Sequence, residues 1–194
     1  MTARRLQLSC VLNPAPIPLP GSPLFAPREK RADSLADIVA FASMAEGAGF
    51  DTLVCEDMSL QAPDGSFEPF TTCSALAAST RQMGLAAAAS PLADEPFNLA
   101  RRLASLGHIS RSRAGWSIDL GMLPAPDAAA RERAGECLDV CTKLWGSWGV
   151  DAIVPGEASA RVEDSRNRPI DHHGRYFQVR GPLDVPRPPR GRPS

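Results

Sequence analysis

The side chains that could do chemistry are few and are scattered along the chain. Glu56 and Asp57 follow a short apolar run, where a carboxylate either binds a ligand or caps a turn, and both interpretations are open. His108 ends an amphipathic segment, which favours a structural role over that of a catalytic base. His172 and His173 fall in a polar stretch and are expected at the surface, with metal binding as the alternative.

Other familiar chemistries have no signature in the sequence. It contains no readable Ser-His-Asp series and no glycine-rich loop that would bind phosphate, so no catalytic residue is assigned. The five cysteines include no CxxC pair, so neither a disulfide framework nor a zinc site is expected. Cys137 and Cys141 lie four residues apart with no histidine at ligand spacing, and we predict that they pack in the core. We expect no metal.

The composition is typical of a soluble globular protein. Of the 194 residues, 43% are hydrophobic and 22% are charged, and no apolar run is long enough to span a membrane. The formal net charge of -1 gives no electrostatic reason to expect nucleic acid or a membrane surface as a partner, so small molecules are favoured. Because no secretory apolar region follows the basic start, we expect a cytoplasmic protein.

Apolar periodicity predicts the elements that must position these side chains. Residues 6–12 read as a strand followed by a proline-rich extended loop, and Asp33 or Ser34 can cap a helix that ends near Gly47. The run 52–55 is too short for a helix and is expected to be a buried strand. Further along, the pattern predicts helices at 67–80, 96–108 and 128–148, and strands at 83–89 and 114–118.

Strands that alternate with helices at these lengths indicate an α/β fold of parallel βαβ units with right-handed crossovers. The last part of the chain, residues 149–194, differs because it is loop-like and rich in proline and arginine. From Arg175 onward it contains five arginines against the single acid Asp184. We interpret this stretch as a solvated linker or a disordered tail, with a phosphate-binding tail as the alternative.

Several sequence blocks resemble the nitrilotriacetate monooxygenase component A and dibenzothiophene sulfone monooxygenase group of the luciferase-like, FMN-dependent monooxygenases. Each block is weak alone, but the ordered series is specific and extends over most of the chain. The blocks are residues 49–57, 67–70, 90–110, 113–116, 144–148 and 169–183.

The resemblance implies an eight-stranded (β/α) TIM barrel. Residues 1–148 would form its N-terminal half, with about four parallel strands and outer helices, and residues 149–194 would lead toward a fifth strand. It also implies an enzyme that takes reduced FMN from a separate flavin reductase and uses O2 on a small organic substrate. Ligands of such barrels sit at the carboxyl ends of the strands, and the resemblance makes Asp57 and Ser90 the expected flavin contacts.

The chain also departs from the family pattern. Asp127 and Arg131 stand where a flavin-contacting His and Tyr are expected, and the flavin phosphate ligands belong to the later part of the barrel. Four parallel strands would leave open edges in a barrel that needs eight. We therefore expect FMN to be weakly bound or lost. We also expect a truncated enzyme, which either pairs with a second copy or a second half-barrel or is a fragment of a larger reading frame. The alternative to an active enzyme is a non-catalytic remnant or a partner-dependent subunit.

Overall fold

A computed structural model describes residues 7–12, 35–57, 67–120, 127–149, 152–154, 161–162 and 164–188. The chain divides into two compact units, one of residues 1–88 with 113–117 and the other of residues 89–112 with 118–194. The extended loop predicted after residue 12 and the cap predicted at Asp33 or Ser34 lie outside the described residues.

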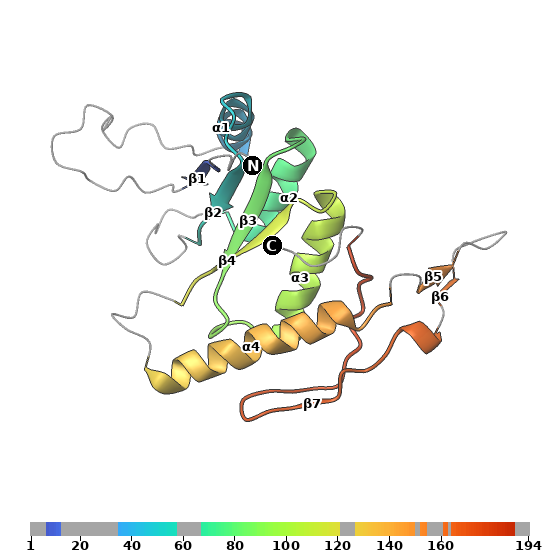
Figure 1. Cartoon of the computed structure of the whole chain (residues 1–194). Coiled ribbons are helices and arrows are strands. Elements are labelled where there is room, and N and C mark those ends of the chain that lie inside the picture. Colours follow the sequence, from blue (N-terminus) through green and yellow to red (C-terminus); the bar gives the residue numbers. More distant parts are fainter. Residues whose placement is uncertain are drawn as a thin grey trace, which may run out of the picture. The chain divides into compact units, whose positions relative to one another are not determined.

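The first unit is built on a sheet of four parallel strands. These are β1 (Ser9–Leu12), β2 (Thr52–Cys55), β3 (Gly84–Ala89) and β4 (Ala114–Ile118), which lie side by side in chain order (Figure 1). Ser9 pairs with Thr52 and Thr52 pairs with Gly84, so the first three strands begin level with one another. The predicted α/β class and the predicted strands are confirmed.

β3 is a strand although its sequence, Gly-Leu-Ala-Ala-Ala-Ala, has the intrinsic preference of a helix. It lies between β2 and β4 in the sheet, and its Leu85 is fully buried. A Cβ added at Gly84 would lie only 3.3 Å from the Thr52 hydroxyl and 3.4 Å from the Asp51 carbonyl oxygen, so glycine permits the close approach to β2. Burial and pairing on both sides therefore override the helical propensity of alanine.

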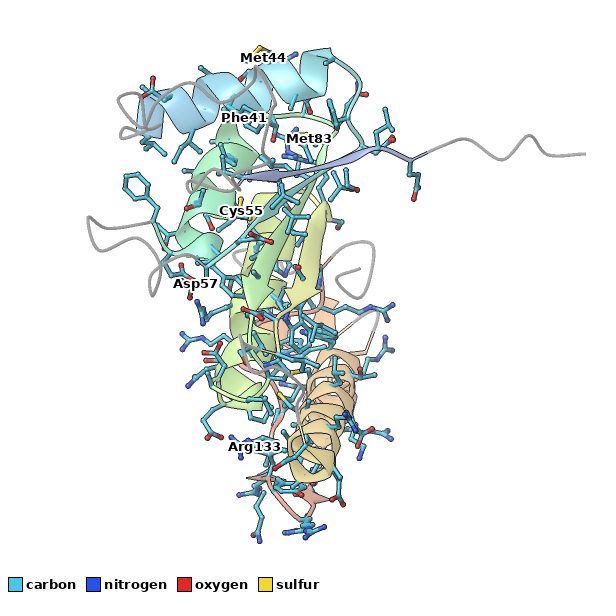
Figure 2. The ribbon with its side chains drawn as sticks, turned by 90° about the vertical axis from the view of Figure 1, so that its left-hand side faces the viewer. Phe41, Met44, Cys55, Asp57, Met83 and Arg133 are labelled. Carbon is cyan, nitrogen blue, oxygen red and sulfur yellow. The ribbon has the colours of Figure 1, made fainter. Side chains whose placement is uncertain are left out.

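Two helices complete the first unit. α1 (Leu35–Gly47) packs on α2 (Pro69–Ser79), and α2 packs on β2. Met44 lies on the outer side of α1, away from the sheet (Figure 2), and is 67% exposed. α2 begins two residues later than predicted because the Glu68 carboxylate caps it, accepting hydrogen bonds from two backbone N–H groups of its first turn.

The second unit contains α3 (Pro96–Ile109) and α4 (Ala128–Gly146), which pack against each other. Their contact is fastened by the Trp145 indole, whose Nε1–H donates to the Ala100 carbonyl at 3.0 Å. Cys137 and Cys141 are fully buried, which confirms their predicted place in the core. α4 ends two residues earlier than predicted, because Ser147 closes its last turn.

Residues 164–188 also belong to the second unit; most of them are exposed or half-buried, but a few residues anchor the segment. A short 3-10 helix, η1 (Asp164–Arg166), precedes a hairpin of β7 (His172–His173) and β8 (Gln178–Val179); a further pair is formed by β5 (Ile153–Val154) and β6 (Arg161–Val162). Phe177 and Leu183 are buried, and the Trp148 indole N–H donates to the Leu183 carbonyl at 2.7 Å. These apolar anchors hold the segment despite its arginines and prolines.

Candidate functional site

Asp57 lies where the sequence predicts it, just after the carboxyl end of β2 (Figure 2). Its side chain is exposed, whereas Cys55, two residues earlier, is buried. An exposed carboxylate in this position can accept hydrogen bonds from N–H groups of a ligand. The first unit therefore supplies one acceptor at the end of an inner strand.

Ser90 directly follows β3 and starts the turn that leads to α3. Its hydroxyl oxygen accepts a hydrogen bond from the Leu92 N–H at 3.3 Å, and its carbonyl accepts from Ala93 N–H at 3.2 Å and Asp94 N–H at 3.0 Å. A hydroxyl that accepts from the backbone still has its own proton to donate. Ser90 is half-buried, and it can therefore offer one directed O–H to an acceptor atom of a ligand. Ser90 belongs to the second unit, whereas Asp57 belongs to the first.

Asp127 and Arg131, which stand where a flavin-contacting His and Tyr are expected, serve the start of α4. The Asp127 carboxylate accepts from the Ala130 N–H at 2.7 Å and caps the helix. Arg131 is exposed in the first turn. Asp127 therefore has a structural role as the N-cap of α4. Its position just before an amphipathic helix in the sequence explains this role.

His172 is held between two side chains of α4. Its Nε2 lies 3.1 Å from the Glu136 carboxylate and its Nδ1 lies 3.1 Å from the Lys143 ammonium group, and its side chain is only 8% exposed. The predicted surface location is therefore wrong for His172 but right for His173, which is exposed. The ring connects the hairpin to the helix, because each nitrogen has a partner on α4.

His108 is exposed at the end of α3, and its Nε2 lies 2.8 Å from the Pro186 carbonyl oxygen, in keeping with the predicted structural role. Within the ranges that the structure describes, no three His, Cys, Asp or Glu side chains are arranged to hold a metal ion. In the same part of the chain, no helix is both long and apolar enough to cross a membrane.

Glu46 is a carboxylate whose role the sequence does not reveal. It accepts hydrogen bonds from three consecutive backbone N–H groups, of Arg81 at 3.0 Å, Gln82 at 2.7 Å and Met83 at 2.8 Å. Burial alone raises the pKa of the Glu46 carboxyl, but these bonds and the nearby charge of Arg113 outweigh it and hold the pKa below its ordinary 4.5. Glu46 thus fixes the segment that enters β3.

Arg113 holds the same segment from the other side. Its guanidinium donates to the Met83 carbonyl at 2.7 Å, to the Thr80 hydroxyl at 2.9 Å, and to the carbonyls of Ala77 and Thr80 at 3.1 Å each. These acceptors include carbonyl groups at the end of α2, and the last carbonyls of a helix have no N–H partner within the helix. Arg113 therefore ties the end of α2 to the start of β3.

Glu136 repeats the arrangement of Glu46 in the second unit. Its carboxylate accepts from the backbone N–H groups of Arg175 at 3.1 Å, Tyr176 at 3.1 Å and Phe177 at 2.8 Å, besides His172 Nε2. Burial raises the pKa of the Glu136 carboxyl, but the hydrogen bonds from His172, Phe177 and Tyr176 lower it below 4.5. Glu136 thus fastens the backbone of the hairpin to α4.

Known proteins resemble this chain in sequence and in fold. A family model described as luciferase-like monooxygenase matches residues 19–193. One subunit of pristinamycin IIA synthase from Streptomyces pristinaespiralis is 38% identical over 166 residues, which cover 84% of this chain and 57% of that protein. Nitrilotriacetate monooxygenase component A of Aminobacter aminovorans is 38% identical over 145 residues, 68% of this chain and 32% of that protein.

Among solved structures, EDTA monooxygenase from Chelativorans sp. BNC1 matches with a TM-score of 0.79 and 30% identity. The match covers 98% of this chain and 50% of that chain. The chain therefore spans between about a third and somewhat over half of the length of these three proteins.

Proposed function

The chain belongs to the luciferase-like monooxygenase family, and from that membership we propose that it acts as a reduced-flavin-dependent monooxygenase that uses O2 on a small organic substrate. The observation that carries the proposal is the family match over residues 19–193, which includes the whole parallel sheet beyond β1. Reduced FMN, when bound, supplies the electrons with which O2 is activated. The protein's part is to bind the flavin, orient it and exclude water.

Asp57 and Ser90 are proposed as FMN contacts. The flavin ring carries N–H and carbonyl groups; Asp57 offers an acceptor for the former and Ser90 a donated O–H for the latter. Each follows the carboxyl end of a parallel strand, where ligands of α/β barrels bind. Binding is expected to be weak, because Asp127 and Arg131 stand where the family pattern has a flavin-contacting His and Tyr, and Asp127 instead caps α4.

Two kinds of partner follow from the proposal. A separate flavin reductase would supply reduced FMN, which is supported by the name of the relative nitrilotriacetate monooxygenase component A, one component of its enzyme. A second copy or a second half-barrel would complete the fold, since the described sheet has four strands and the match spans 50% of EDTA monooxygenase.

FMN binding tests the site. Titration of the purified protein with FMN under reducing, anaerobic conditions should show saturable binding by absorbance and fluorescence. Asp57→Asn and Ser90→Ala should each raise the Kd for FMN about 10-fold, as expected for loss of one hydrogen bond. Asp37→Asn is the matched control, because Asp37 is exposed in the first turn of α1, and it should leave the Kd unchanged. Equal Kd values for all variants would remove Asp57 and Ser90 from the site.

Turnover tests the activity itself. The protein is supplied with a flavin reductase, NADH, FMN and O2, together with a panel of small organic acids that includes nitrilotriacetate and EDTA. Oxygenated product above the level formed by the reductase alone is the expected result. If neither FMN binding nor product is found, for the single chain and for its oligomer, the chain is instead a non-catalytic remnant or a partner-dependent subunit.

A further inference from the structure

Glu56 is a half-buried carboxylate at the carboxyl end of β2. Successive side chains of a strand point to opposite faces of the sheet. Leu53 and Cys55 are buried on the face against which α2 packs, whereas Val54 is half-buried on the other face. Because Glu56 directly follows Cys55, the same alternation places it on the face of Val54. It therefore stands at the end of the strand where ligands of α/β barrels bind, on the side away from α2.

Ala88 of β3 is the neighbour of Glu56 across the sheet. Cys55 pairs with Ala87, and the next residue of each strand continues that register. Ala88 is 6% exposed whereas Ala87 is fully buried, which agrees with a position of Ala88 on the less covered face. An alanine side chain is a single methyl group, so Ala88 gives a ligand a flat apolar surface beside the Glu56 carboxylate.

Ser117 of β4 stands on the other side of Ala88. The Leu85 N–H donates to the Arg113 carbonyl at 2.8 Å, which in a parallel ladder sets Leu85 beside Ala114. Three residues further along each strand, Ala88 lies beside Ser117. Because β2, β3 and β4 are adjacent (Figure 1), a polar side chain flanks Ala88 on each side in one row of the first unit. Neighbouring strands are about 4.8 Å apart, so the two outer Cα atoms of the row are about 10 Å apart.

Both polar side chains of this row are available to a ligand. Among the described residues, neither the Glu56 carboxylate nor the Ser117 hydroxyl group has a hydrogen-bond or ion-pair partner, and both residues are half-buried. A carboxylate that is partly withdrawn from water is best stabilised by a cation that donates hydrogen bonds to it. A serine hydroxyl group donates and accepts, so it does not select a charge. The pair therefore favours a ligand with a cationic group at one end and a neutral polar group at the other.

We propose that Glu56 and Ser117 bind the organic substrate and select one that carries an ammonium group. The ammonium N–H groups donate to the Glu56 carboxylate, and a hydroxyl or carbonyl group at the far end of the molecule bonds with the Ser117 hydroxyl group. The apolar part of the molecule lies over Ala88. The span of about 10 Å suits a small molecule with one six-membered ring and two polar substituents. That this ligand is the substrate rests on the proposed function, whereas the binding of an amine does not.

Charge makes the inference specific. A molecule of similar shape with a carboxylate in place of the ammonium group would bring a like charge to Glu56, and like charges placed together in an interface lower the affinity. A neutral molecule would neither gain the charge-assisted hydrogen bond nor suffer the repulsion. The affinity should therefore fall in the order ammonium, neutral, carboxylate.

Three probes of similar shape test this order. They are 4-hydroxybenzylamine, which is a cation at pH 7, 4-hydroxybenzyl alcohol, which is neutral, and 4-hydroxybenzoate, which is an anion. Their binding to the wild-type chain is measured by isothermal titration calorimetry without flavin, reductase or NADH. The Kd of the amine should be about 10-fold below that of the alcohol, and the benzoate should bind more weakly than either. Because no flavin is present, the result does not depend on whether the chain is a monooxygenase.

Two variants assign the two ends of the ligand. Glu56→Gln keeps the shape of the side chain but removes its charge, so it should raise the Kd of the amine about 10-fold and leave that of the alcohol unchanged. Ser117→Ala should raise the Kd of all three probes about 5-fold, since each carries the same phenol group. Asp37→Asn is the matched control, because it removes one negative charge from the exposed first turn of α1, and it should change none of the Kd values. Circular dichroism checks that each variant is folded.

The proposal is overturned if no probe binds, if the three probes bind with equal Kd, or if Glu56→Gln weakens all three alike. Titration with FMN separates a substrate contact from a flavin contact. Glu56→Gln should keep the wild-type Kd for FMN, and a rise equal to that of Asp57→Asn would assign Glu56 to the flavin and overturn the proposal. If the amine binds as expected but FMN does not bind, the amine site stands and the monooxygenase proposal fails.

Discussion

Glu46 and Glu136 each accept hydrogen bonds from three consecutive backbone N–H groups, but the segments that they hold have different support. The segment bound by Glu46 runs directly into β3, a central strand of a four-stranded sheet. The segment bound by Glu136 belongs to a hairpin whose strands are two residues long. In the first unit, the hydrogen bonds of Glu46 therefore add to the support that the sheet already gives its segment. In the second unit, the hydrogen bonds of Glu136 are a principal attachment of the hairpin.

The apolar contribution differs in the same way. Met83, at the end of the segment bound by Glu46, is 1% exposed, and Leu85 to Ala89 of β3 are all buried. In the hairpin, Phe177 is buried under the guanidinium of Arg133, which lies 4.6 Å from its ring centroid. Loss of the Glu136 carboxylate should therefore destabilise the hairpin locally. The stability of the segment bound by Glu46 should depend mainly on the buried residues of β3.

The largest effect is expected from the core of the first unit. Leu85→Ala removes a fully buried side chain from β3, and large-to-small changes at such sites lower the free energy of unfolding by about 3 kcal/mol. Urea denaturation followed by circular dichroism measures it. Leu8→Ala is the control, because Leu8 is 43% exposed beside the same sheet, and it should cost much less. Similar losses for both variants would contradict the burial of β3.

Glu46→Gln should have a smaller effect. The amide keeps the shape of the side chain but loses the charge that attracts three N–H groups, and because the site is partly exposed, the expected loss is about 1 kcal/mol in the free energy of unfolding. Glu95→Gln is the control, since Glu95 precedes α3 without a side-chain hydrogen bond to it. A free energy of unfolding equal to that of the wild type would show that Arg113 and the buried residues of β3 hold the segment without the Glu46 charge.

Lowering the pH should gradually weaken the hydrogen bonds that the Glu46 and Glu136 carboxylates accept. The pKa of the Glu46 carboxyl and that of the Glu136 carboxyl are both below 4.5 in the folded protein, so their contribution is complete above 4.5 and is lost as the pH falls below 4.5 through the lowered values. Thermal melts between pH 7 and about pH 3 should show Tm falling below pH 4.5. In Glu46→Gln this fall should be shallower; an unchanged profile would count against the carboxylate.

The contrast between the two carboxylates also marks what a sequence can predict. The strand at 52–55 and the helix that begins at Pro96 follow from local apolar periodicity, and the positions of Asp57 and Ser90 follow from where the strands end. The partners of Glu46 lie 35 to 37 residues away and those of Glu136 lie 36 to 41 away, and no local pattern announces them. The contact of Asp57 and Ser90 with flavin stays a prediction.

The anchoring of the last segment could not be predicted, for a related reason. Arginine and proline dominate residues 175–194, and composition alone favours a solvated chain. Its docking depends on single residues, Phe177 and Leu183, and on hydrogen bonds with distant side chains, such as that of the Trp148 indole N–H to the Leu183 carbonyl. A few well-placed anchors can therefore order a segment whose average composition indicates the opposite.

The smallest effect on overall stability, and the most local one, is expected from Glu136→Gln. The amide offers one oxygen and presents an NH2 group to the N–H groups of Arg175, Tyr176 and Phe177, so the hairpin should open more often while the α3–α4 core stays folded. Amide hydrogen exchange in residues 172–179 should accelerate on the order of 10-fold, with α3 unchanged. Glu132→Gln is the control, because Glu132 accepts only from the side chains of the hairpin, and it should change exchange less. If exchange accelerated equally throughout α3 and the hairpin, the two would open as one element, and the carboxylate would support the whole unit.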